Sequence, residues 1–219
     1  MKLVATNLVL IGLCIFAIFS KADDNHVHID QVNSGDGFDF NVDQIGYDNK
    51  IDFSFDHANN EFNLSQRGSG NLISWVPWWG SGKTWGGDVD GTNNTINIDQ
   101  QGGATYGAHV WGNYNAVDIY QDGTHETFLD VHASNTDIDI WQEDSGDKYA
   151  QVYFYGNSSY STVDMMQKGT GAHSATVTLQ GSYSTDLTLT QQGSTTQTYT
   201  LTQNCATAGG CSVSVTQGN

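Results

Sequence analysis

The residues with the most regular spacing are glutamines that close short segments of alternating apolar side chains, as in residues 117–121. Alternate residues of a β-strand face the same side, so each glutamine would share a buried face with the two apolar residues before it. A single buried amide is costly, whereas stacked amides hydrogen-bond to one another. The pattern therefore predicts a ladder of the following glutamines: Gln44, Gln66, Gln100, Gln121, Gln142, Gln167, Gln191, Gln203 and Gln217.

Carboxylates occupy the opposite side of the same segments. The alternation predicts outward-facing side chains for Asp30, Asp43, Asp99, Asp118, Asp139 and Asp164. Clustered carboxylates suit Ca²⁺, but a solvated acidic face that opposes aggregation is the favoured interpretation. The seven histidines show no three-ligand spacing, so we assign them turn and surface roles and predict no metal site and no cofactor.

Motifs for catalysis are missing from the sequence. It contains no G-x-S-x-G, H-E-x-x-H or EF-hand pattern, and residues 80–84 end like a phosphate loop without its leading glycine. The many aspartates do not single out a pair for glycoside hydrolysis. We therefore predict no catalytic residues and a protein that is not an enzyme.

Four of the six tryptophans gather in one segment that breaks the glutamine pattern. They are Trp75, Trp78, Trp79 and Trp85. Two interpretations stay open: a platform that contacts carbohydrate or protein, or a small satellite core packed on the flank of the molecule. Packing is the favoured one.

The net charge, the first 22 residues and the last two cysteines restrict the partners and the localisation of the protein. The 219 residues carry a net charge of −17, which argues against nucleic acid or an anionic membrane surface as a partner. Residues 1–22 have a basic start, a short apolar run and small residues at the end, as in a signal peptide. Cys205 and Cys211 then predict a local disulfide in an exported chain, with no membrane insertion.

The glutamines reveal the repeat that must position all these side chains. Gln44 to Gln191 recur at intervals of 22, 34, 21, 21, 25 and 24 residues, and each period holds a second, weaker apolar segment. Two strands and two turns per period are the size of one rung of a β-solenoid. We predict an all-β solenoid of about seven to eight rungs, with repeats over 23–72 and 93–219 and an insertion over 73–92.

Strand, glutamine, glycine, turn and strand at this period resemble the curlin repeat of bacterial curli subunits, most closely at residues 116–123. The resemblance implies a secreted subunit of extracellular amyloid fibres in the biofilm matrix, where such fibres serve surface adhesion. It also implies passage through the periplasm, a curli-type export machinery and other curlin subunits as partners. In this chain the Trp-rich insertion and the absence of a long Gly-rich leader depart from the family pattern.

Repeats extend from residues 27–31 to residues 213–219 without an evident cap. Unpaired strand edges at both ends of a solenoid favour head-to-tail stacking, and a contact of this kind does not close, so it yields a homopolymer. The expected function is therefore a fibre subunit. A minor, nucleator-like subunit and a monomeric adhesin that binds matrix polysaccharide through the Trp-rich loop are the alternatives.

Overall fold

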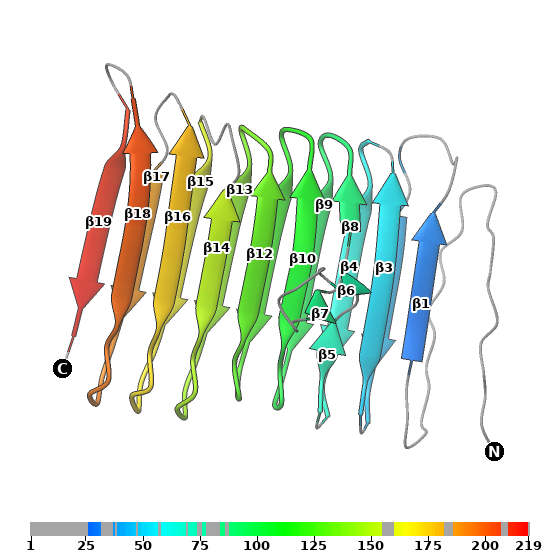
Figure 1. The fold of residues 1–219 in the computed structure, drawn as a ribbon. Helices are drawn as coiled ribbons and strands as arrows, with labels where there is room; N and C mark the ends of the chain where they lie inside the picture. Colours follow the sequence, from blue (N-terminus) through cyan, green and yellow to red (C-terminus); the bar gives the residue numbers. More distant parts are fainter. Residues whose placement is uncertain are drawn as a thin grey trace.

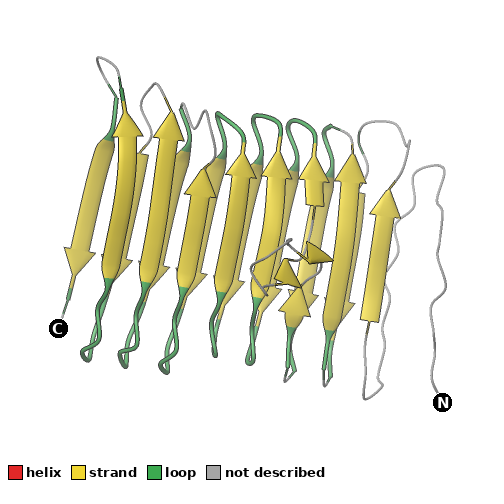
Figure 2. Cartoon of the chain, in the orientation of Figure 1, coloured by secondary structure: helices red, strands yellow, loops and turns green. Residues whose placement is uncertain are grey.

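The computed structural model describes residues 26–31, 37, 39–46, 48–56, 58–68, 70–73, 76–77, 84–85, 88–154, 160–181, 186–206 and 210–218. These residues form strands and turns and include no helix (Figure 2). The chain winds into a stack of strand–turn–strand rungs, drawn side by side in Figure 1 from β1 at the right to β19 at the left. The prediction of an all-β solenoid is confirmed.

The first half of the described chain contains β1 (His26–Gln31), β2 (Asp39–Gln44), β3 (Lys50–Asp56), β4 (Glu61–Gln66), β5 (Leu72–Ile73), β6 (Val76–Pro77), β7 (Thr84–Trp85), β8 (Asp88–Asp90), β9 (Thr95–Gln100) and β10 (Tyr106–Trp111). The second half contains β11 (Ala116–Gln121), β12 (Thr127–His132), β13 (Asp137–Gln142), β14 (Ala150–Phe154), β15 (Thr162–Gln167), β16 (Ala175–Gly181), β17 (Asp186–Gln191), β18 (Tyr199–Cys205) and β19 (Ser212–Gln217). Most strands have six residues, which fits two of them into each period.

Two parallel sheets result, because each rung gives one strand to each sheet. Sheet A has the order β1-β3-β5-β10-β12-β14-β16-β18, with β8 pairing both β3 and β10. Sheet B has eight strands in the order β2-β4-β9-β11-β13-β15-β17-β19. Equivalent residues pair directly: Gln121 is the Cα partner of Gln100 on one side and of Gln142 on the other.

The core lies between the two sheets. Strands β2 to β17 of sheet B alternate buried and outward positions, as in β13, where Ile138, Ile140 and Gln142 are buried and Asp137, Asp139 and Trp141 are exposed. Inward residues of one strand stack on those of the next, so apolar columns run along the whole solenoid. Burial of these columns drives folding, and the glutamines must be accommodated within them.

The insertion interrupts a single strand of sheet A. Ile73 of β5 pairs with Ile51 and Tyr106, and Val89 of β8 pairs with Phe55 and Val110, so β5 and β8 are two halves of one strand position. Ile73 and Val89 are both fully buried. Between them β6 and β7 pair antiparallel, and Figure 1 shows this pair in front of sheet A.

Candidate functional site

The structure brings all the predicted glutamines except Gln203 into one column of sheet B, which is buried except at Gln217 on its last strand. Gln44 is 1 % exposed and the six glutamines from Gln66 to Gln191 are 0 % exposed. Side-chain amides bond directly to each other: Gln167 Nε2 donates to Gln142 Oε1 at 2.9 Å, and Gln191 Nε2 donates to Gln167 Oε1 at 2.9 Å. Each of these Nε2 atoms also donates to a backbone carbonyl in the following turn, Ser174 O and Thr198 O, both within 2.9 Å. The amides therefore tie the sheet to its turns.

The column consists of two hydrogen-bonded segments that run in opposite directions. Gln44 donates to Gln66 and Gln66 to Gln100, whereas the glutamines from Gln217 back to Gln142 each donate toward the N-terminal neighbour, ending at Gln121. Where the segments meet, Gln100 and Gln121 donate to Thr105 O and Glu126 O instead.

The prediction for Gln203 is wrong. It lies on β18 of sheet A, where its Cα partner is Leu179, rather than in the glutamine column of sheet B. Its Nε2 has no hydrogen-bond partner among the described residues. The residue pattern of the second strand in each period resembles that of the first, which is why the sequence alone placed Gln203 with the others.

A second buried polar column, which the sequence analysis missed, lies in the turns before the strands of sheet A. His125, Lys148 and His173 stand two residues before paired strand starts and are each 1 % exposed. Lys148 Nζ donates to Gly169 O of the next rung at 2.9 Å, and both ring nitrogens of His173 face carbonyl oxygens, Lys168 O at 2.6 Å and Thr196 O at 3.1 Å. Burial and Lys148 lower the pKa of His125. The surface role expected for these histidines is thus wrong at His125 and His173, which are buried in the turns, and the ring of His173 joins two neighbouring turns.

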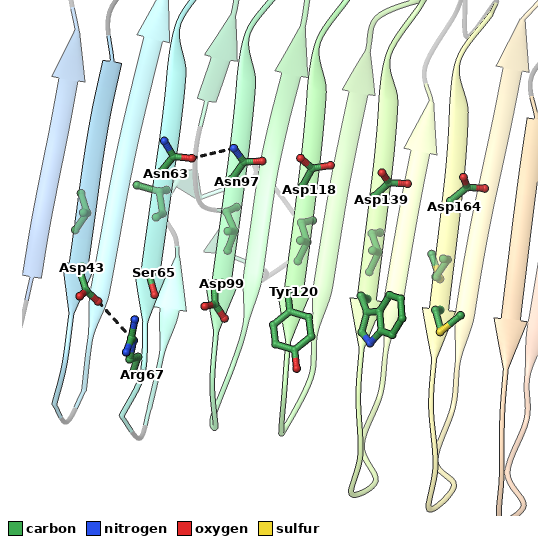
Figure 3. A pocket seen from close by; sticks show the side chains of 18 of the residues that line it. Asp43, Asn63, Ser65, Arg67, Asn97, Asp99, Asp118, Tyr120, Asp139 and Asp164 are labelled. Atoms are coloured by element: carbon green, nitrogen blue, oxygen red, sulfur yellow. Dashed lines mark hydrogen bonds and ion pairs between the residues drawn. The ribbon is translucent and has the colours of Figure 1, made fainter.

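The outer face of sheet B carries a groove of about 900 Å³ that crosses the strands from β2 to β17. One wall is a column of amides and carboxylates at the centre of each strand (Figure 3). Asn63 Nδ2 donates to Asn41 Oδ1 at 3.0 Å and Asn97 Nδ2 to Asn63 Oδ1 at 2.9 Å. Asp118, Asp139 and Asp164 continue this line as direct Cα partners, and we call these three residues the acid column.

Stacked carboxylates in the groove repel each other. Burial raises the pKa of Asp139, and the carboxylates of Asp118, Asp164 and Asp137 raise it further. Burial and Asp137 likewise raise the pKa of Asp118. The folded chain therefore binds protons at these sites more readily than the unfolded chain does.

We expect Asp139→Asn to stabilise the fold at pH 7 by up to about 1 kcal/mol, because a neutral amide removes repulsion from both register neighbours. A raised folded pKa gives stability that is full below the unfolded value of 3.8 and declines as pH rises through the folded value. Urea unfolding from pH 4 to pH 7 should therefore show a flatter profile for the variant. Asp186→Asn is the control, since its register partners are Thr162 and Ser212. An unchanged profile for Asp139→Asn would contradict the repulsion.

The other wall of the groove lies two residues further along each strand. On successive strands of sheet B, this wall consists first of Asp43, Ser65 and Asp99. It then continues with Tyr120, Trp141 and Met166, which we call the platform column. Trp141 is 39 % exposed, and its Nε1 donates to Glu143 Oε1 at 2.8 Å. Lys168 Nζ lies 4.6 Å from the Trp141 ring centroid and 3.2 Å from Glu143 Oε1. The platform thus combines aromatic surface with nearby carboxylate charge.

The predicted disulfide cysteines and the tryptophans of the insertion are only partly described by the structure. Cys211 is disulfide-bonded, whereas the side chain of its predicted partner Cys205 lies outside the described part. Trp75, Trp78 and Trp79 also lie outside it, and Trp85 is placed only as backbone of β7.

Within the described ranges, no three His, Cys, Asp or Glu side chains gather closely enough to hold a metal ion, and no helix has the length and apolarity to cross a membrane. Asp43, Asp99, Asp118, Asp139 and Asp164 line the outer groove as expected, while the side chain of Asp30 is not described.

Comparison with known proteins gives no relative: no protein-family model, no curated protein and no solved structure matches this chain.

Proposed function

We propose that this chain is an exported structural subunit that stacks head to tail into extracellular, curli-like amyloid fibres. The observation that carries the proposal is the exposure of core residues at one end of the solenoid. Val213 and Val215 of β19 are 39 % and 37 % exposed, whereas their register partners Leu187 and Leu189 are 1 % and 0 % exposed. The same column is buried until the strands stop, so a further rung would bury it again.

Both ends offer matching surfaces. At the other end of sheet B, β2 pairs only with β4 among the described strands, and β2 presents Phe40, Val42 and Gln44 inward. Placing Gln217 over Gln44 sets Val213 over Phe40 and Val215 over Val42. Gln44 Oε1 is buried without a hydrogen-bond partner among the described residues, so a donor from a neighbouring chain would satisfy it.

Sheet A and the outer faces support the same register. By the strand pairing, Tyr199 and Leu201 of β18 occupy the columns that Val27 and Ile29 occupy in β1, and all four are partly buried against the core. Outward residues at the junction would be Ser212, Ser214 and Thr216 against Asp39, Asn41 and Asp43. Because hydroxyl groups are uncharged, they can lie beside the carboxylates of Asp39 and Asp43 without like-charge repulsion. A contact between two different ends does not close and extends as a filament.

The test is seeded growth of the freshly desalted chain from residue 23, followed by thioflavin T fluorescence and electron microscopy. We expect a lag phase, fibres, and loss of the lag when fibre fragments are added. A chain that stays monomeric and β-rich for days would overturn the proposal and favour the ligand-binding adhesin. A minor, nucleator-like role would show as a short lag together with acceleration of other curlin subunits.

A further inference from the structure

The groove on the outer face of sheet B has a surplus of negative charge. Its lining includes Asp43, Asp99 and the acid column, against Arg67 as the one basic residue that lines it in the described part. Arg67 is already engaged, because its Nε lies 3.8 Å from Asp43 Oδ1. A second copy of this chain would bring another acidic face and a net charge of −17, so charge complementarity calls for a cationic occupant.

Aromatic surface on the second wall restricts the occupant further. Figure 3 shows the Tyr120 ring on the groove side of its strand, in line with Asp99 and two residues from Asp118. Burial raises the pKa of the Tyr120 phenol, and the carboxylates of Glu143, Asp122 and Asp99 raise it further. An aromatic ring near carboxylates attracts ammonium groups in two ways: the ring face makes a cation–π contact, and the carboxylates attract the positive charge.

The chain itself already seats an ammonium in this way one rung away. Lys168 Nζ lies over the Trp141 ring, 4.6 Å from its centroid, and also contacts Glu143 Oε1 at 3.2 Å. Aromatic face and carboxylate thus hold an amine together on this wall. Tyr120, the neighbour of Trp141 in register, lines the open groove together with the carboxylates of Asp99 and Asp118.

Regular spacing indicates a polymer rather than a small molecule. The acid column and the platform column both advance by one strand per rung, about 4.8 Å, in a straight line along the solenoid. An extended β-1,4-linked pyranose chain advances by a similar step per unit and has apolar C–H faces that stack on aromatic rings. Its successive units are turned over, so every second unit presents the same side to a wall, and each unit carries an ammonium group when the units are glucosamine.

We propose that this groove binds a linear, β-1,4-linked polysaccharide of glucosamine, with sugar rings beside Tyr120 and Met166 and with the ammonium groups of alternate units on the acid column, Asp118, Asp139 and Asp164. The groove belongs to one chain, so binding does not depend on fibre formation. In a fibre the columns of successive chains would form one longer track.

The experiment measures binding of a glucosamine hexamer at pH 6 by titration calorimetry on the full chain, with the N-acetylated hexamer and hexalysine as comparison ligands. We expect the glucosamine hexamer to bind more tightly than either. Tyr120→Ala should weaken its binding about tenfold, and the triple variant Asp118→Asn, Asp139→Asn, Asp164→Asn should abolish it. Trp111→Ala is the matched control, because Trp111 is 42 % exposed but lies on sheet A, and it should leave binding unchanged.

Circular dichroism of each variant shows whether a loss of binding reflects unfolding. The substituted side chains face outward, so we expect the β-sheet spectrum to stay unchanged. Equal binding of the N-acetylated hexamer would overturn the role of the ammonium groups. Hexalysine binding as tight as that of the glucosamine hexamer, with no effect of Tyr120→Ala, would reduce the groove to a non-selective acidic surface and overturn the proposal. Absence of glucosamine binding would overturn it as well.

Discussion

Replacing Val215 by proline should stop fibre elongation while leaving the folded chain intact. Gly218 N donates to Gln191 O across β17 and β19 at 2.8 Å, and successive residues of a strand bond alternately to its two sides. The N–H of Val215 therefore points away from β17, toward the edge that the next chain would cover. Proline removes this donor and is tolerated on edge strands.

We expect Val215→Pro to slow elongation by about tenfold or more, since one unmet partner at the junction costs about 1–3 kcal/mol. Small amounts of the variant should also block growth of wild-type fibres, because it can add to a fibre through β1 and β2 and then present a defective edge. Val215→Ile keeps the N–H, the β-branched shape and the apolar surface, and it should grow almost as wild type. Wild-type growth rates for Val215→Pro would exclude β19 as the growing edge.

Replacing Gln142 by leucine should destabilise the monomer by roughly 2–3 kcal/mol, although leucine is of similar size and apolar. Gln142 Nε2 donates to Gln121 Oε1 and to Tyr149 O, both at 2.9 Å, and its Oε1 accepts from Gln167. The substitution leaves the Tyr149 carbonyl without this donor in the core and cuts the ladder between Gln121 and Gln167.

Urea unfolding followed by circular dichroism measures this effect. Gln192→Leu is the matched control, because Gln192 is exposed in the turn after β17 and its substitution should change stability by less than about 0.5 kcal/mol. If Gln142→Leu unfolds at the same urea concentration as wild type, the ladder contributes no net stability. The glutamines would then serve register alone.

Much of the fold could be predicted from the sequence because each rung of the solenoid repeats the same alternation of inward and outward residues. Ile119 and Gln121 alternate with Asp118 and Tyr120, and this alternation fixes both the buried and the outward face. The recurring interval then fixes how strands stack. The outward position of the acid column followed from the same periodicity.

Other features depend on contacts between rungs that a single segment does not encode. Nothing around Ile73 and Val89 signals that they complete one strand position across an insertion. Burial of Lys148 and His173 arises because turns stack and supply carbonyl oxygens from the next rung, which a turn sequence alone does not reveal. The reversal of the ladder between Gln100 and Gln121 likewise depends on which turn carbonyl each amide reaches.

The central claim, that chains stack end to end with sheets in register, is tested most directly by mass per length of single unbundled filaments in scanning transmission electron microscopy. The eight strands of sheet B advance by about 38 Å at the spacing of parallel strands. Head-to-tail stacking predicts one chain for each such length, together with a meridional spacing of about 4.8 Å. A value near two chains per length would mean that chains lie side by side, and it would contradict the end-to-end junction.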